Sequence, residues 1–211
     1  SEITTNRFAP VSVTGEAGRP PVRVGPSIVD MGSGLWAVLG IVCALMARRD
    51  SGRGAVVDVS LFETAAAWMT MHSAMFLASG VPPGRNGSGQ TGIAPYRAYR
   101  CADGDLVVTA GNDPLFASLC TVLGEPAWAT DARFADNATR VAHGDALNAL
   151  IEARLATRSR AEWVTLLDAA GVPCAPVQDV AEMLAHPQTQ ALDIVRPVAG
   201  SSIPMIGLPL R

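Results

Sequence analysis

Apolar residues dominate two long stretches near the start of the chain, and shorter apolar and polar runs alternate after them. Residues 31–47 carry no charge, and the pattern around them predicts a helix over residues 28–49. Residues 55–61 are rich in valine and predict a strand, and residues 62–78 predict a second apolar helix. Helical and strand-like runs that alternate in this way indicate a parallel α/β layer.

A segment rich in proline and glycine, residues 80–92, forms the natural boundary in the chain, whereas residues 1–26 read as a loop. After the boundary, Asp103-Gly104 lies between two strand-like runs and predicts a β-hairpin. The remaining pattern predicts a compact α+β unit, followed by a strand-like tail over 194–211 that prolines interrupt. Its expected elements are strands at 96–101, 106–110 and 174–177, and helices at 113–123, 140–156, 159–170 and 179–185.

The composition raises the question of what covers so much apolar surface. Apolar residues make up 49% of the chain and charged residues only 17%, so a membrane, a partner subunit or a further piece of the same fold must accept the surplus. The uncharged stretch at 31–47 is at the lower length limit of a membrane span and contains three glycines. We therefore expect a helix buried in protein and no membrane. Residues 1–19 lack the apolar core of a signal peptide, which favours a cytoplasmic location.

The charged residues exclude several functions. All sixteen basic residues are arginine, so lysine Schiff-base chemistry and a Walker-type phosphate loop are absent. A net charge of −3 without a basic stripe argues against a nucleic-acid partner. The four cysteines and three histidines are dispersed, so we expect no metal site, and we expect Cys43 and Cys120 to be reduced, buried thiols.

The run Gly87–Gly92 matches the letters of the dinucleotide-binding pattern G-x-G-x-x-G. That pattern needs a strand before it and a helix after it. Here Pro82-Pro83 precedes the run and Pro95 with a hairpin follows, so we reject a Rossmann phosphate loop. A mobile flap and a plain flexible linker both remain open for these glycines.

Asp30, at the start of the first long helix, has two interpretations. Aspartate is a preferred N-cap residue, and this structural role is the more common one. Alternatively, the helix dipole and the free amides keep the carboxylate ionised, and it attacks an acyl carbon as a nucleophile. The residues alone leave the choice open.

A resemblance to a known family covers nearly the whole chain from about Val13 onward. The run VRVGPSIVD at 22–30 resembles the active-site segment of family III CoA-transferases, the CaiB/BaiF group. Further segments resemble that family in the same order along the chain. They are ARR at 47–49, SGRGAVVDVSL at 51–61, PYRAY at 95–99 with DG at 103–104, DARF at 131–134, EW at 162–163 and AGVPCAPV at 170–177.

The resemblance implies a chemistry and a set of site residues. In such enzymes an aspartate, here Asp30, attacks a CoA thioester to form a mixed anhydride, which CoA thiolate converts to an aspartyl-CoA thioester that an acceptor acid then takes up. A glycine-rich flap closes over the acyl intermediate, and an equivalent of Leu61 contacts CoA. The flap corresponds here to Gly87, Ser88, Gly89 and Gln90. Coenzyme A is a substrate in this scheme, and no cofactor or metal is bound permanently.

The resemblance also implies an α/β fold: part of a Rossmann-like large domain followed by a small α+β domain. We expect residues 1–80 to belong to the large domain, 81–95 to be flap and linker, 96–185 to form the small domain, and 186–211 to return towards the large domain. Family members are about twice as long and form interlocked homodimers, so we interpret the chain as a fragment without the N-terminal CoA-binding half.

Two alternatives to the transferase stay open. An acyl-CoA racemase or epimerase resembles the same region and uses the equivalent aspartate as acid and base, together with a histidine further upstream. No histidine precedes Asp30 here. The other alternative is a chain without catalysis of its own that serves folding or dimerisation.

Overall fold

The computed structural model describes residues 9–210. It divides the chain into two compact units, one ending at Thr91 and the other beginning at Gly92. The two units are described separately below. The expectation of a loop at residues 1–8 lies outside the described residues, and the rest of the expected N-terminal loop contains one short helix, α1 (Ala9–Ser12).

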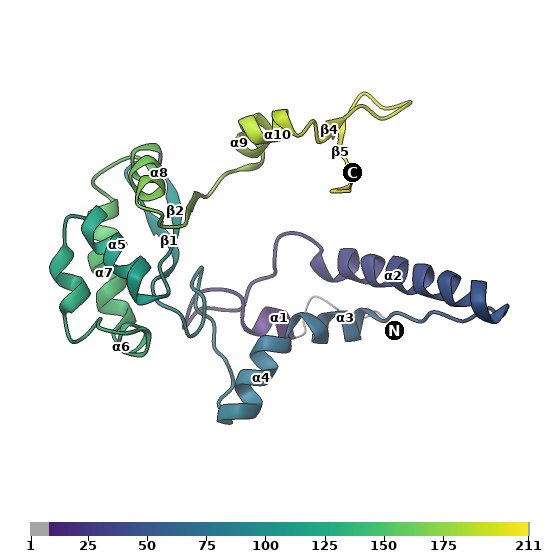
Figure 1. The fold of residues 1–211 in the computed structure, drawn as a ribbon, viewed down its shortest axis with the longest axis horizontal. Helices are drawn as coiled ribbons and strands as arrows, with labels where there is room; N and C mark the ends of the chain where they lie inside the picture. Colours follow the sequence, from purple (N-terminus) through teal and green to yellow (C-terminus); the bar gives the residue numbers. More distant parts are fainter. Residues whose placement is uncertain (1–8, 211) are drawn as a thin grey trace. The chain divides into compact units, whose positions relative to one another are not determined.

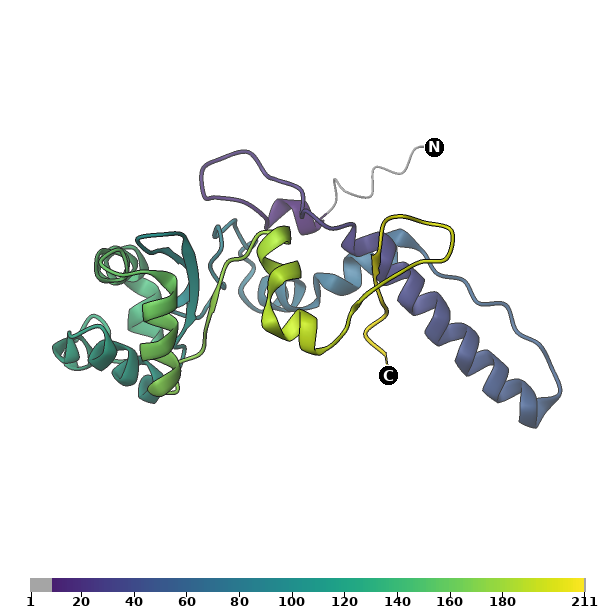
Figure 2. The ribbon, with the colours of Figure 1, turned by 90° about the horizontal axis from the view of Figure 1, so that it is seen from above.

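The described part of the first unit is helical. Its long helix is α2 (Ile28–Ser51), which confirms the prediction over 28–49 and ends at Gly52 in the left-handed conformation, with φ +68°. The expected helix over 62–78 is two helices, α3 (Leu61–Trp68) and α4 (Thr70–Ser79), because Met69 leaves the helical conformation between them. In this unit, the extended chain after α2 runs back along the helix, as both views show (Figures 1 and 2).

The strand predicted at 55–61 is not formed: residues 53–60 are extended but unpaired, and α3 begins at Leu61. A strand needs a neighbour to accept its backbone hydrogen bonds, and no described residue of the first unit supplies one. The parallel layer expected from this pattern is therefore not present among the described residues.

The described residues of this chain leave α2 largely uncovered, and its burial against other protein stays a prediction. Only Val29 and Gly32 of its 24 residues are buried. Large apolar side chains remain exposed along it, namely Met31, Leu35, Trp36, Val38, Leu39, Ile41, Val42, Leu45 and Met46. Cys43, expected to be buried, is exposed on the same helix. By length and composition alone, α2 also meets the criteria for a membrane-crossing helix.

The second unit is built on the predicted hairpin. Strands β1 (Tyr96–Arg100) and β2 (Asp105–Thr109) pair antiparallel, and β3 (Cys174–Pro176) adds to β2, giving the order β1-β2-β3. Alternate residues face the core, with Leu106 and Val108 fully buried on β2. The three predicted strands of this unit are confirmed.

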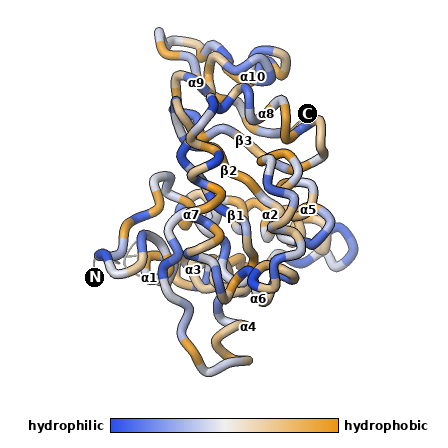
Figure 3. Tube along the Cα trace, turned by 90° about the vertical axis from the view of Figure 1, so that its left-hand side faces the viewer, coloured by the Kyte–Doolittle hydropathy of each residue, from blue (hydrophilic) through white to orange (hydrophobic). Residues whose placement is uncertain are grey.

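Helices cover this sheet and close a core. The predicted helices at 113–123 and 159–170 are confirmed, whereas the one expected over 140–156 is interrupted at His143, whose φ of −107° and ψ of 26° are not helical. Helix α7 (Gly144–Leu155) mixes hydrophilic and hydrophobic residues along its length (Figure 3). The elements are α5 (Asp113–Val122), the 3₁₀ helix η2 (Pro126–Thr130), α6 (Asn137–Ala142), α7 (Gly144–Leu155) and α8 (Arg160–Ala169).

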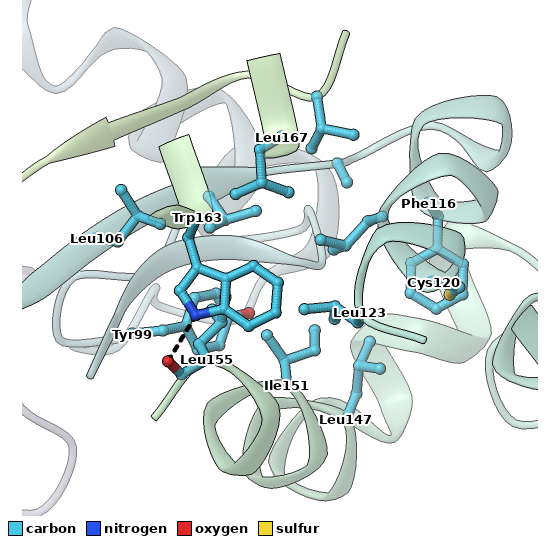
Figure 4. Close-up of a cluster of buried hydrophobic side chains, with 14 of the residues drawn as sticks. Tyr99, Leu106, Phe116, Cys120, Leu123, Leu147, Ile151, Leu155, Trp163 and Leu167 are labelled. Carbon is cyan, nitrogen blue, oxygen red and sulfur yellow. Dashed lines mark hydrogen bonds between the residues drawn. The ribbon is translucent and has the colours of Figure 1, made fainter. Parts of the chain in front are cut away.

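The core of the second unit gathers residues from β1, β2, α5, α7 and α8 (Figure 4). At its centre Trp163 is buried and its Nε1 donates a hydrogen bond of 2.8 Å to the Leu155 carbonyl oxygen. Cys120 is buried in this cluster, as predicted, and all four cysteines are free. The apolar sequence of this unit is therefore matched by burial within the chain itself.

The tail of the chain adds two short helices and a small hairpin. Arg160 joins the first of these helices to the end of β3, because its Nη1 donates to the Val177 carbonyl oxygen at 2.8 Å and its Nη2 to Glu182 Oε1 at 3.0 Å. The helix expected over 179–185 is confirmed. The elements are α9 (Val180–Ala185), α10 (Pro187–Ala191), β4 (Val195–Arg196) and β5 (Met205–Ile206).

Candidate active site

Asp30 lies in the first turn of α2, and its side chain is exposed. The N-cap position is occupied by Ser27, so the interpretation of Asp30 as the N-cap is wrong. The Ser27 hydroxyl accepts a hydrogen bond of 3.0 Å from Arg23 Nη2. Arg23 Nη1 donates to the Gly25 carbonyl oxygen, also at 3.0 Å. The Ser27 side chain makes no capping hydrogen bond, so it leaves the amides of the first turn uncapped, in the same turn that carries Asp30.

Helix α3 fixes the start of α2 through small residues. Ser33 Oγ donates to Thr64 Oγ1 at 2.9 Å and to the Val29 carbonyl oxygen at 2.8 Å. Gly32, the residue just before Ser33, is buried, and a Cβ built on it would lie 2.8 Å from Trp68 Cζ2. Only glycine allows the two helices to approach this closely. The helix end that carries Asp30 is therefore held by side-chain contacts to α3.

A hollow of about 230 Å³ opens beside this contact. Trp36 and Trp68 lie near it as a tilted pair, with ring centroids 6.4 Å apart. Ser60 caps α3 at its edge, and Ser60 Oγ donates to Glu63 Oε2 at 2.6 Å. Leu61 is half-buried beside this cap but is not among the residues that line the hollow. The lining residues are Trp36, Asp58, Val59, Ser60, Glu63, Thr64 and Ala67.

The segment Gly87–Gln90 forms a tight loop whose backbone favours glycine at Gly87. Gly87 has φ +59°, and a Cβ there would lie 2.6 Å from Glu16 Oε1. The Gly87 amide donates to the Gly15 carbonyl oxygen at 2.9 Å, and a Cβ on Gly89 would lie 2.8 Å from Asn86 Nδ2. These contacts place the loop against residues 15–16, and the structure does not join Gly87 or Gly89 to Asp30 by a hydrogen bond.

The thiols of the second unit are poor nucleophiles. Burial raises the pKa of Cys101, Cys120 and Cys174 to about 11, and neighbouring carboxylates add to the shift at Cys101 and Cys174. A thiol with such a pKa stays protonated at neutral pH, and the thiolate is the reactive form. Burial also raises the pKa of Tyr99 above its usual range. The exposed Asp30 carboxylate is therefore a better candidate nucleophile than these groups.

The sequence reasoning missed the residues that hold the site in place. Thr64 and Trp68 contact the start of α2 from a distant part of the chain. Arg23 acts through the conformation of the loop before α2. No local sequence pattern indicates such contacts. The one available signal was Gly32, a glycine inside a helix, which often marks a close packing contact.

The fold is that of the CaiB/BaiF class. The structure matches that of a CAIB/BAIF family protein from Brucella suis with a TM-score of 0.79 and 35% identity, over 95% of this chain and 53% of that one. The sequence matches the profile of CoA-transferase family III over residues 2–211. The chain belongs to CoA-transferase family III.

Individual relatives support this assignment. An acetyl-CoA:oxalate CoA-transferase of Acetobacter aceti is 38% identical over 94% of this chain and 51% of its own length. A succinate–glutarate CoA-transferase of Agrobacterium fabrum is 32% identical over 95% of this chain and 51% of its own. The chain thus spans about half the length of these relatives, and the expected fold, a fragment of the family III fold, is confirmed.

Proposed function

We propose that the protein carrying this chain transfers CoA between an acyl-CoA thioester and a carboxylic acid, with Asp30 as the nucleophile. The observation that carries the proposal is the exposed Asp30 carboxylate at the N-terminus of α2, in a chain of CoA-transferase family III. A carboxylate at such a position can attack an acyl carbon as a nucleophile.

The reaction proceeds through two kinds of covalent intermediate. The Asp30 carboxylate attacks the thioester carbonyl, and CoA leaves as its thiolate to give an aspartyl-acyl anhydride. The thiolate then attacks the aspartyl carbonyl, which forms an aspartyl-CoA thioester and releases the donor acid as carboxylate. An acceptor carboxylate repeats the two steps in reverse, so the new acyl-CoA departs and Asp30 is regenerated.

In this proposal the other predicted residues serve binding and protection. Gly87, Ser88, Gly89 and Gln90 form a flap that keeps water from the anhydride, because a water molecule would hydrolyse it. Leu61 contacts CoA at the start of α3. The donor and acceptor are small molecules, CoA is a substrate, and no resident cofactor or metal takes part.

The exposed apolar residues of α2 fit a helix that is covered in the whole molecule. Solved structures that match this chain are about twice as long. We propose that the remainder of the fold and a second subunit, in an interlocked homodimer, cover this helix, so that it serves neither a membrane nor a nucleic acid. The protein would then act in the cytoplasm.

Trapping of the covalent intermediate tests the role of Asp30. The whole protein is incubated with an acyl-CoA, treated with hydroxylamine or borohydride, and digested for mass spectrometry. We expect modification of Asp30 only in the presence of acyl-CoA, and a fall in transfer of at least about 10³-fold for Asp30→Asn, the size typical of a lost nucleophile. Asp50→Asn, at the opposite end of the same helix and also exposed, is the matched control and should keep its activity.

The choice of acids makes the assay informative. Relatives are named for acetyl-CoA with oxalate and for succinate with glutarate, so these donors and acceptors form the first panel. Transfer that persists while Asp30 stays unmodified would refute its role. Deuterium exchange at the α-carbon of an acyl-CoA, without transfer to any acid, would instead identify a racemase. The 211 residues alone should show no turnover.

A further inference from the structure

The C-terminal end of the glycine-rich segment is anchored by a helix far away in the sequence. Asn137 Nδ2 donates to the Gly92 carbonyl oxygen at 2.9 Å, and the Ala94 amide donates to Asn137 Oδ1 at 3.1 Å. One side chain therefore binds the backbone on both sides of Ile93, which itself packs directly on Gly111. All of these residues belong to the second unit.

The anchoring side chain is itself held firmly. Asn137 is the first residue of α6, and the preceding Asp136 caps that helix: the Thr139 amide donates to Asp136 Oδ1 at 2.8 Å, and the Asp136 amide donates to Thr139 Oγ1 at 3.1 Å. Such a reciprocal cap fixes the first turn of a helix. Asn137 therefore has a defined position before it contacts the backbone at 92–94.

Arg140, one turn further along α6, adds a third bond to the same backbone. Its guanidinium is fully buried and lies over the Phe116 ring, 4.6 Å from the centroid. Its Nε donates to the Ala94 carbonyl oxygen at 2.9 Å, Nη1 to the Phe134 carbonyl oxygen at 3.0 Å and Nη2 to Asp113 Oδ1 at 2.8 Å. A buried charge is stable only when it is paired in this way, so the arrangement resists change.

The first residue of this anchor has a backbone conformation that favours glycine. Gly92 has φ +81°, and a Cβ built on it would meet nothing within 4 Å. The first residues of the glycine-rich loop are held mainly through backbone contacts to residues 15–16. The bonds from α6 therefore begin at Gly92, directly after the residues of the glycine-rich loop.

We propose that Asn137 and Arg140 are positioning residues for the flap. They hold residues 92–94 stationary, so that opening and closing is confined to the residues before Gly92 and the flap returns to one closed position. This inference rests on the proposed function, because it assumes that Gly87–Gln90 closes over an acyl intermediate. A flap that closes imperfectly admits water, which attacks the anhydride and releases the donor acid while Asp30 is regenerated. The loss appears as hydrolysis of acyl-CoA at the expense of transfer.

Asn137 is the residue to change, since removal of the buried Arg140 would leave its acceptors unpaired and endanger folding. Asn137→Ala removes both bonds to the loop. Asn137→Asp keeps the acceptor for the Ala94 amide, loses the donor to Gly92, and places an acidic residue at a helix start, where it is tolerated. Ala138→Ser, at the exposed neighbouring position, is the matched control.

Two measurements on the whole protein test the proposal. The first is amide hydrogen exchange: we expect Ala94 to exchange at least about tenfold faster in Asn137→Ala, with β2 and α8 unchanged, as for loss of a local protecting bond. The second is the ratio of acyl-CoA hydrolysis to CoA transfer. It should rise at least about threefold in Asn137→Ala and less in Asn137→Asp, while KM for acyl-CoA stays within about twofold.

The outcomes separate this inference from the proposed function. If the unchanged protein transfers CoA and forms the Asp30 adduct, but Asn137→Ala alters neither the exchange nor the ratio, the anchor has no role. The anchor is likewise refuted if Ala94 exchanges faster while the ratio stays constant, because Asn137 is then purely structural. If the unchanged protein shows no transfer at all, the proposed function fails, and the Ala94 exchange still reports whether the anchor exists.

Discussion

The two units of the chain use similar apolar sequences in opposite ways. In the second unit, side chains from the sheet and its helices are buried together, among them Leu106, Leu147 and Trp163. In the first unit, a 24-residue helix of comparable apolar character buries only Val29 and Gly32. Burial of apolar surface is the main stabilising contribution in folding. The second unit therefore obtains that stabilisation from its own residues, whereas the first has the sequence of a buried element without the surroundings that would bury it.

The exposed apolar surface of α2 bears on where the candidate site lies. Exposed apolar surface as extensive as that of α2 marks an interaction surface in a folded protein. The candidate nucleophile, Asp30, lies at the start of that same helix. We infer that whatever covers α2 also completes the surroundings of Asp30.

The largest expected contrast is between Trp163→Ala and Leu45→Ala. Trp163 is buried in the core of the second unit, and its loss should cost about 3–5 kcal/mol of unfolding free energy. Leu45 is 53% exposed on α2, so its truncation should change the stability of the 211-residue chain by less than about 0.5 kcal/mol. Urea unfolding followed by far-UV circular dichroism measures both.

A smaller core substitution is a control in case Trp163→Ala does not fold. Ile151→Val, in the same core as Trp163, should cost about 0.5–1.5 kcal/mol. Leu45→Ala should then be repeated in the whole protein, where a covered α2 predicts a cost of about 2 kcal/mol or more. If the cost of Leu45→Ala is equally small in both settings, α2 is not covered, and the inferred contrast between the units is wrong.

Thiol labelling gives the second contrast. At pH 8, a pKa of about 11 leaves roughly one Cys120 molecule in a thousand as thiolate, and the side chain is also buried. Cys43 is exposed on α2. In the 211-residue chain we expect iodoacetamide to modify Cys43 at least about a hundredfold faster than Cys120, as mass spectrometry of quenched samples would show.

The pH dependence and the whole protein sharpen this result. Because the Cys120 thiol is protonated below its raised pKa, its labelling should accelerate as pH rises from 8 towards 10, provided that the core stays folded. In the whole protein Cys43 should become protected, and Cys43→Ser identifies its signal. Rapid labelling of Cys43 in the whole protein would contradict the proposal that α2 is covered.

The sequence was sufficient for elements whose signal is local. The hairpin at Asp103-Gly104, the long helix α2 and helix α8 follow from turn residues and apolar periodicity. Prediction failed where strand pairing or burial depends on contacts with other parts of the fold. Residues 55–61 have strand-forming side chains but no partner strand among the described residues. Cys43 lies in an apolar run that predicts burial, but its side chain is exposed in this chain.

The candidate site shows the same division. Asp30 was found through the resemblance, and its place in the first turn of a helix through local pattern. Gly87 packs against Glu16, seventy-one positions earlier in the chain, and the anchor at Asn137 depends on a contact with Gly92. Such pairings come from the folded backbone, which no single stretch of sequence specifies.

The smallest expected effect distinguishes two glycines of α2. A Cβ on Gly34 would meet nothing within 4 Å, so Gly34→Ala should stabilise the helix in the 211-residue chain by about 0.5–1 kcal/mol through reduced backbone entropy. A Cβ on Gly40 would lie 2.7 Å from Val57 Cγ1, and valine is stiff at χ1. Gly40→Ala should therefore be less stable than Gly34→Ala by about 1 kcal/mol. Thermal unfolding of the helical signal measures the difference. Equal stability of the two variants would show that residues 53–60 do not lie along α2, whereas a loss of CoA transfer in Gly34→Ala of the whole protein would show that the open face of α2 is occupied there.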